Sequence, residues 1–101
     1  MFIKNNRYIT RGINKELDLR LQLILWNIID SLKEEGKDLD YLQVFKLRKY
    51  EEKIIIEHNQ EVPKYKENYV LDLNDIEINK IIKVFVIDSE DYSTMMLAEE
   101  Y

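Results

Sequence analysis

The sequence has no cysteine, one proline, one histidine and only two glycines among its 101 residues. Without cysteine the chain forms neither disulfides nor thiolate metal sites, which fits a reducing compartment. A 46% share of hydrophobic residues and the lack of any low-complexity run exclude an intrinsically disordered chain. We therefore expect one globular domain over residues 1–101, a length that suffices for a single modest core.

Long hydrophobic runs are missing as well. The start, Met1 to Lys4, is followed by two asparagines and an arginine, so it lacks the apolar stretch of a signal peptide. No segment approaches the length of a membrane span, and we expect a cytoplasmic protein without membrane contact. The net charge of −5 disfavours bulk attraction to nucleic acid or anionic lipid, although it leaves room for a local basic patch.

Hydrophobic periodicity predicts one long helix and several strands. Asn14 or Asp18 can cap the helix, Gly36 marks its end, and we place it from Asp18 to about Glu35. Alternating or β-branched segments predict strands at 7–10, 41–50, 53–58, 69–73, 80–88 and from 91 to 97, with a break at 59–64. This order predicts an α+β fold, in which one helix packs on one face of a mostly antiparallel sheet of five to six strands.

The predicted helix carries more apolar residues than one face requires. At about 100° per residue, one broad stripe should face the sheet; it consists of Leu21, Ile24, Leu25, Ile28, Ile29 and Leu32. Leu19, Leu23 and Trp26 lie roughly opposite this stripe. Either residues 2–3 or 95–97 of the same chain cover them, or they form the centre of a homodimer or partner interface, where a large aromatic is an effective anchor.

Motifs for catalysis or metal binding are also missing. His58 is the only histidine and has no second histidine at ligand spacing, so we interpret it as an exposed structural residue. Ser93 lacks a nucleophile elbow, and neither glycine belongs to a phosphate-binding loop. The acidic segments 34–40, 72–77 and 88–91 lack the order of a calcium loop; solvated loops are the simpler interpretation, and a surface that mimics nucleic acid is the alternative. We predict no enzyme, no cofactor and no metal.

Basic residues and tyrosines gather in the first predicted strand and in the strand 41–50. If these two strands are neighbours, Arg7, Arg11, Lys46 and Arg48 form with the tyrosines a stacking platform for single-stranded nucleic acid. The simpler interpretation is a solvated strand face with cross-strand pairs to acidic residues. The overall acidity of the chain favours this second interpretation.

Five segments that together span nearly the whole chain resemble a known family: RYITRGIN, LQLILWNIID, LDYLQVFKL, QEVPKY and VIDSEDYSTMMLAEEY. They are similar to small proteins of the domain of unknown function 960 family, from Gram-positive bacteria and their phages and plasmids. The resemblance implies a cytoplasmic bacterial protein of mobile-element origin, where short acidic proteins often bind host or phage proteins. It implies no activity.

Two hypotheses of function result. The leading hypothesis is a non-enzymatic interaction module that forms a homodimer or binds another protein through Leu19, Leu23 and Trp26. The alternative is a nucleic-acid-associated module that uses the basic residues and tyrosines of the two strands. The two differ in their response to salt, because only binding to nucleic acid weakens steeply as the salt concentration rises.

Overall fold

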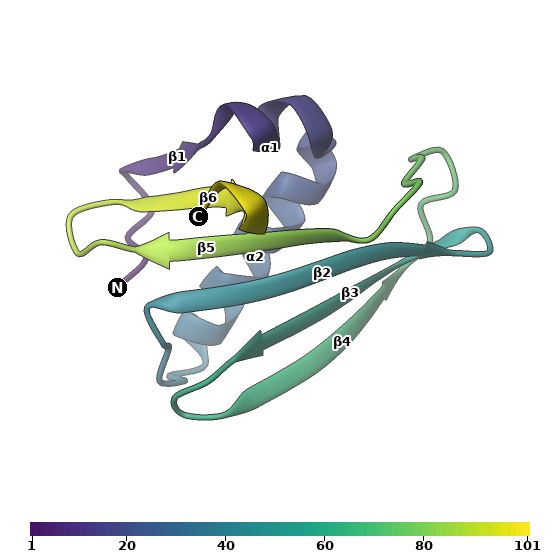
Figure 1. The fold of residues 1–101 in the computed structure, drawn as a ribbon. Coiled ribbons are helices and arrows are strands. Elements are labelled where there is room, and N and C mark those ends of the chain that lie inside the picture. Colours follow the sequence, from purple (N-terminus) through teal and green to yellow (C-terminus); the bar gives the residue numbers. More distant parts are fainter.

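In the computed structural model, which describes residues 1–101, six strands form one sheet in the order β1-β6-β5-β2-β3-β4 (Figure 1). The strands are β1 (Arg7–Ile9), β2 (Leu42–Tyr50), β3 (Lys53–Gln60), β4 (Tyr65–Leu71), β5 (Ile82–Asp88) and β6 (Ser93–Leu97). Neighbouring strands are antiparallel, except that β1 runs parallel to β6 at one edge. The structure confirms the predicted α+β fold with its mostly antiparallel sheet.

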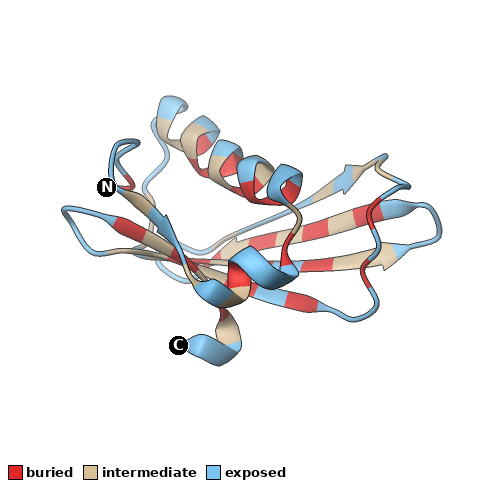
Figure 2. Cartoon of the chain, turned by 90° about the horizontal axis from the view of Figure 1, so that it is seen from above, coloured by how far each residue is buried: buried red, intermediate tan, exposed pale blue.

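The long helix α2 (Leu19–Glu34) lies on one face of this sheet (Figure 2). Its bounds agree with the prediction because the end signals act as expected. Asp18 is the N-cap, and its side chain accepts a hydrogen bond from the backbone N–H of Arg20. Gly36, just beyond the C-cap, has φ of +79°, a conformation that glycine adopts without strain. No helix of the chain combines the length and apolar character that a bilayer span requires.

Two short helices were not predicted. The first, α1 (Arg11–Glu16), begins after Thr10, whose hydroxyl accepts a hydrogen bond from the N–H of Ile13. The helix has only six residues and Ile13 is the only buried one, so its sequence shows no helical periodicity of apolar residues. The second, η1 (Ala98–Glu100), follows directly after β6.

The prediction for β4 was wrong in position. The expected break at 59–64 is a shorter turn over 61–64, because β3 continues to Gln60 and β4 already begins at Tyr65. The middle of β4 is Lys66, Glu67 and Asn68, all exposed, at the edge of the sheet. Edge strands commonly carry charged residues that block further pairing. In β4 such residues interrupt the alternation of apolar and polar residues on which the prediction relied.

The core lies between α2 and the sheet. All six residues of the predicted stripe face it, with Ile24 only partly buried. On the sheet side, seven side chains are completely enclosed: Phe45, Leu47, Ile54, Ile56, Val84, Val86 and Met95. Full burial of one such side chain stabilises the fold by about 1.5–3 kcal/mol relative to exposure, so this layer holds the helix in place.

The opposite side of the sheet, which we call the open face, has no second layer. Figure 1 is viewed onto this face, with α2 behind the sheet, and Figure 2 shows that only η1 lies on its side. Strand alternation and register assign to the open face the following residues of the two central strands: Leu42, Val44, Lys46, Arg48 and Tyr50 of β2, and Lys83, Phe85 and Ile87 of β5.

Candidate interaction surfaces

The residues predicted to bind a partner form a stripe along the side of α2 that faces away from the sheet. Leu19 and Leu23 are 65% and 60% exposed. Trp26, one turn further on, is half-buried and packs against the edge of the core. No other part of the chain covers the two leucines, whereas the tryptophan is partly covered by residues of the core. We call these three residues the α2 stripe.

Arg7 covers the ring of Trp26. Its guanidinium carbon lies 4.7 Å from the ring centroid, within the range of a cation–π contact. The same group forms a two-pronged ion pair with Asp30, and it donates hydrogen bonds to the backbone oxygens of Phe2 and Ile3. The hydrogen bonds of Arg7 lower the pKa of the Asp30 carboxyl below its usual value. The N-terminal segment thus covers Trp26 through Arg7, while the Phe2 side chain itself is in the core.

The structure does not bring together the four basic residues proposed for nucleic acid. Strands β6 and β5 separate β1 from β2, so the condition that the two basic strands are neighbours is not met. Arg7 is engaged on the helix side, and Arg11 is exposed at the start of α1. Only Lys46 and Arg48 share a surface, the open face. The sequence could not reveal this, because the order of strands in a sheet does not follow their order in the chain.

A different basic cluster, which sequence reasoning missed, occupies the middle of the open face. Lys46 of β2 lies directly opposite Lys83 of β5, and Arg48 follows Lys46 on the same face. None of the three forms an ion pair within 4 Å. Aromatic rings flank this basic ladder of Lys46, Lys83 and Arg48: the Lys83 Nζ is 5.7 Å from the Phe85 centroid, and the Arg48 guanidinium carbon is 5.9 Å from that of Tyr50. The alternation of residues 80–88 already placed Lys83 beside Phe85, but the pairing with β2 was not visible.

The prediction that His58 is exposed is wrong. Because β3 continues to Gln60, strand alternation turns residue 58 toward α2, and its side chain is fully buried. The imidazole stacks on Phe45 with the centroids 4.4 Å apart, and its Nε2 lies 2.6 Å from Oε1 of Gln43. Burial lowers its pKa to about 4. His58 is therefore a neutral core residue at pH 7, out of contact with solvent.

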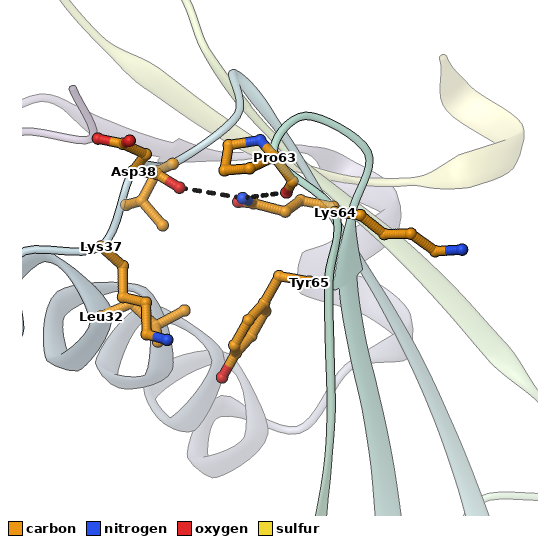
Figure 3. Close-up of a pocket in the computed structure, with 8 residues that line it drawn as sticks. Leu32, Lys37, Asp38, Pro63, Lys64 and Tyr65 are labelled. Atoms are coloured by element: carbon orange, nitrogen blue, oxygen red, sulfur yellow. Dashed lines mark hydrogen bonds between the residues drawn. The ribbon is translucent and has the colours of Figure 1, made fainter.

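A pocket of about 160 Å³ lies at the C-terminal end of α2 (Figure 3). Leu32, Lys37 and Tyr65 face one another across it, and the amide nitrogen of Gln60 donates hydrogen bonds to the backbone oxygens of Asp38 and Pro63. Gln60 Oε1 accepts hydrogen bonds as well. The Gln60 amide therefore joins the loop before β2 to the turn between β3 and β4. The charged side chains that line the pocket, those of Lys37, Asp38 and Lys64, form no ion pair within 4 Å. Nowhere in the chain do three or more His, Cys, Asp or Glu side chains converge as metal ligands do.

These observations define a two-layer α+β domain with a helix on one side of its sheet and an open, locally basic face on the other. The chain belongs to the family described as "Staphylococcal protein of unknown function (DUF960)", whose sequence model matches residues 6–100. It is similar in structure to a solved protein, "Crystal structure of the protein of unknown function from Enterococcus faecalis". That likeness has a TM-score of 0.82 at 25% identity and covers 95% of this chain and 90% of the other. No curated protein is significantly similar in sequence.

Proposed function

We propose that the protein is a non-enzymatic interaction module of the bacterial cytoplasm, and that its α2 stripe packs against the α2 stripe of a second copy. The observation that carries the proposal is the exposure of Leu19 and Leu23 on a helix whose other side is anchored in the core. The cytoplasmic location and an origin in a phage or mobile element belong to the proposal too, because they rest on the family resemblance and on the absence of cysteine.

The spacing of the α2 stripe supports a helix as its partner. Leu19, Leu23 and Trp26 follow one another at intervals of four and three residues, the spacing by which helices pack side by side. The stripe is rigid before binding, because the opposite face of α2 is packed in the core, and so little conformational entropy is lost on association.

The charges around the α2 stripe support a second copy of the chain rather than a charged partner. Arg20 pairs with Asp18 and Asp75, and Asp30 pairs with Arg7, so these ionic groups beside the stripe already have partners within the chain. The ammonium group of Lys33 donates a hydrogen bond to the backbone oxygen of Phe2. An apolar stripe of this kind is self-complementary across a two-fold axis. Three side chains make a small contact, and we expect a weak dimer that depends on protein concentration.

The place of His58 supports the non-enzymatic part of the proposal. Its imidazole is enclosed by the core and hydrogen-bonds to Gln43, so it meets no substrate at the surface.

Sedimentation velocity over micromolar to near-millimolar protein tests the proposal. We expect the mass to rise from that of the 12.3-kDa monomer toward the dimer, with little effect of salt. The double variant Leu19→Glu/Leu23→Glu should stay monomeric, whereas the matched control Val62→Glu/Ile81→Glu, at exposed apolar residues elsewhere, should associate like the unmodified protein. A monomer at every concentration, or association that survives in the α2 double variant, would overturn the proposal.

A further inference from the structure

We propose that the open face of the sheet binds single-stranded nucleic acid along the basic ladder, a function that goes beyond association through α2. The first observation is the placement of like charges. Lys46 and Lys83 are direct cross-strand partners in the β2–β5 register. Directly opposed like charges destabilise an antiparallel pair, and residues that break such a local rule are typical of functional surfaces.

The second observation is that these charges lack compensation inside the chain. Glu57 lies opposite Lys46 on β3, but its carboxylate is 3.6 Å from the Nζ of Lys66. Lys53, at the far end of the same face, has Asp72 at 3.6 Å. Lys46, Lys83 and Arg48 are thus the strand cations of the open face that have no acidic partner, in a protein whose net charge is −5. Because the overall negative charge opposes long-range attraction, an anionic partner would have to be held by close contacts with these three cations.

The third observation is the position of the aromatic rings. Phe85 lies opposite Val44, and Lys46, Arg48 and Tyr50 follow at alternate positions of β2. Rings and cations therefore share one surface over about 20 Å of extended strand, at roughly 3.3 Å per residue. Tyr50 is 57% exposed, and Phe85 is contacted edge-on by the ring of Tyr101. Cations that meet phosphates, beside rings on which bases stack, are what a single strand of nucleic acid requires.

The shape of the surface favours a single strand over other anions. A six-stranded sheet is too broad to enter the major groove of a duplex as a helix does, and its rings need unstacked bases. An acidic peptide that extends the sheet would have to pair at one of its two edges. The exposed centre of β4 carries Lys66 and Glu67 and resists such pairing, and β1 is only 3 residues long. Glu99 lines the same surface hollow as Lys83, and Glu57 lies opposite Lys46, so both are acidic side chains that a bound phosphate must avoid.

Fluorescence anisotropy of a labelled oligothymidine single strand tests the inference. For three phosphate contacts, the logarithm of the affinity should fall with the logarithm of salt with a slope of about −2, which is about 20-fold weaker binding between 50 and 200 mM. Lys46→Thr/Lys83→Thr should reduce the slope to about −0.7, and Tyr50→Ala should weaken binding about tenfold. Glu99→Gln should strengthen binding. The control Lys4→Ala/Lys64→Ala, at exposed lysines outside the ladder, should bind like the unmodified protein.

A melting measurement on the same variants separates binding from folding. Because the two threonines remove a repulsion and suit a strand, Lys46→Thr/Lys83→Thr should melt no lower than the unmodified protein while it loses affinity. Absence of binding at 50 mM salt would overturn the inference. So would equal loss of affinity in the Lys4/Lys64 control, or displacement of the strand by polyglutamate as efficient as that by unlabelled oligothymidine. The α2 variants that abolish dimers should leave binding of one strand per chain intact, which keeps the two proposals separable.

Discussion

The residues around His58 determine its protonation state and its tautomer. The amide nitrogen of Gln43 donates to Gln60 Oε1 and to the backbone oxygen of Asp40, so Gln43 turns its own Oε1 toward the imidazole. His58 Nε2 must then carry the proton and donate it, while Nδ1 has no hydrogen-bond partner. A second proton would place an uncompensated charge in the core, which is why burial lowers the pKa to about 4.

This histidine predicts a pH dependence of stability. Between the ordinary pKa of 6.5 and the folded value of about 4, the unfolded chain binds a proton that the folded protein does not. The free energy of unfolding should therefore fall as the pH falls, by ~1 kcal/mol between pH 7 and 5.5 and by ~3 kcal/mol at pH 4. Urea unfolding measures this loss, and NMR follows the single imidazole directly. His58→Phe should flatten the dependence between pH 7 and 5.5, whereas an imidazole that titrates near 6.5 in the folded protein would contradict the prediction.

Elements with a clear period were predictable, and elements set by their neighbours were not. The α2 helix combines a 3.6-residue period with end signals, and β2, β3, β5 and β6 alternate or are continuously apolar, so their positions followed from sequence. The helix α1 was too short to show a period, and β4 was too polar. Likewise, the position of Leu19 and Leu23 opposite the core stripe followed from angles around one helix, but whether the chain itself covers them did not. The pairing of Lys46 with Lys83 depends on a register between distant segments.

The Arg7–Asp30 ion pair joins β1 to α2. We expect its loss to lower the free energy of unfolding more than the loss of the Arg20–Asp75 pair. The side chains of Arg7 and Asp30 are only 14% and 16% exposed, whereas those of Arg20 and Asp75 are 49% and 63% exposed. Asp30→Ala leaves Arg7 partly buried without its partner and should destabilise the protein by about 1–3 kcal/mol. Asp75→Ala, the matched control, should cost less than about 1 kcal/mol because solvent screens the exposed pair.

Urea unfolding with fluorescence detection compares the two variants. The only tryptophan, Trp26, lies under Arg7, so Asp30→Ala should also shift the emission of the folded protein, and Asp75→Ala should not. Equal losses of stability, or an unchanged emission in Asp30→Ala, would show that the pair does not fix β1 to the helix. The lowered pKa of Asp30 also predicts how this stabilisation depends on pH. It is present at neutral pH and is lost as the pH falls through the pKa of Asp30 in the folded protein, which lies below the ordinary value of 3.8.

At the scale of the molecule, the two proposed surfaces lie on opposite sides. The α2 stripe is on the helix side, and the basic ladder is on the open face (Figure 2). A dimer through α2 would therefore leave both open faces directed outward and free. Two such faces would bind one long strand more tightly than either alone, provided that the strand spans the dimer.

The Glu100 carboxylate links the start of α1 to the C-terminal turn, and this contact predicts a non-additive pair of substitutions. Glu100 accepts hydrogen bonds from the hydroxyl of Thr10 at 2.6 Å and from the backbone N–H groups of Gly12 and Leu97 at 3.2 and 2.8 Å. These bonds lower the pKa of Glu100, with Thr10 as the largest cause. They also bring the carboxylate so close that a Cβ on residue 12 would lie 2.6 Å from it.

Gly12→Ala should therefore displace the Glu100 carboxylate from its three donors and lower the Tm by at most about 5 °C, because this carboxylate is the end of a flexible side chain that can move away. Glu100→Ala should lower the Tm as well, whereas Glu99→Ala, at the exposed neighbour without these bonds, should not. In Gly12→Ala/Glu100→Ala the clash no longer exists, and the double variant should melt at the temperature of Glu100→Ala alone. Thermal melts of the four proteins measure the coupling. Additive losses would mean that residue 12 and Glu100 act independently.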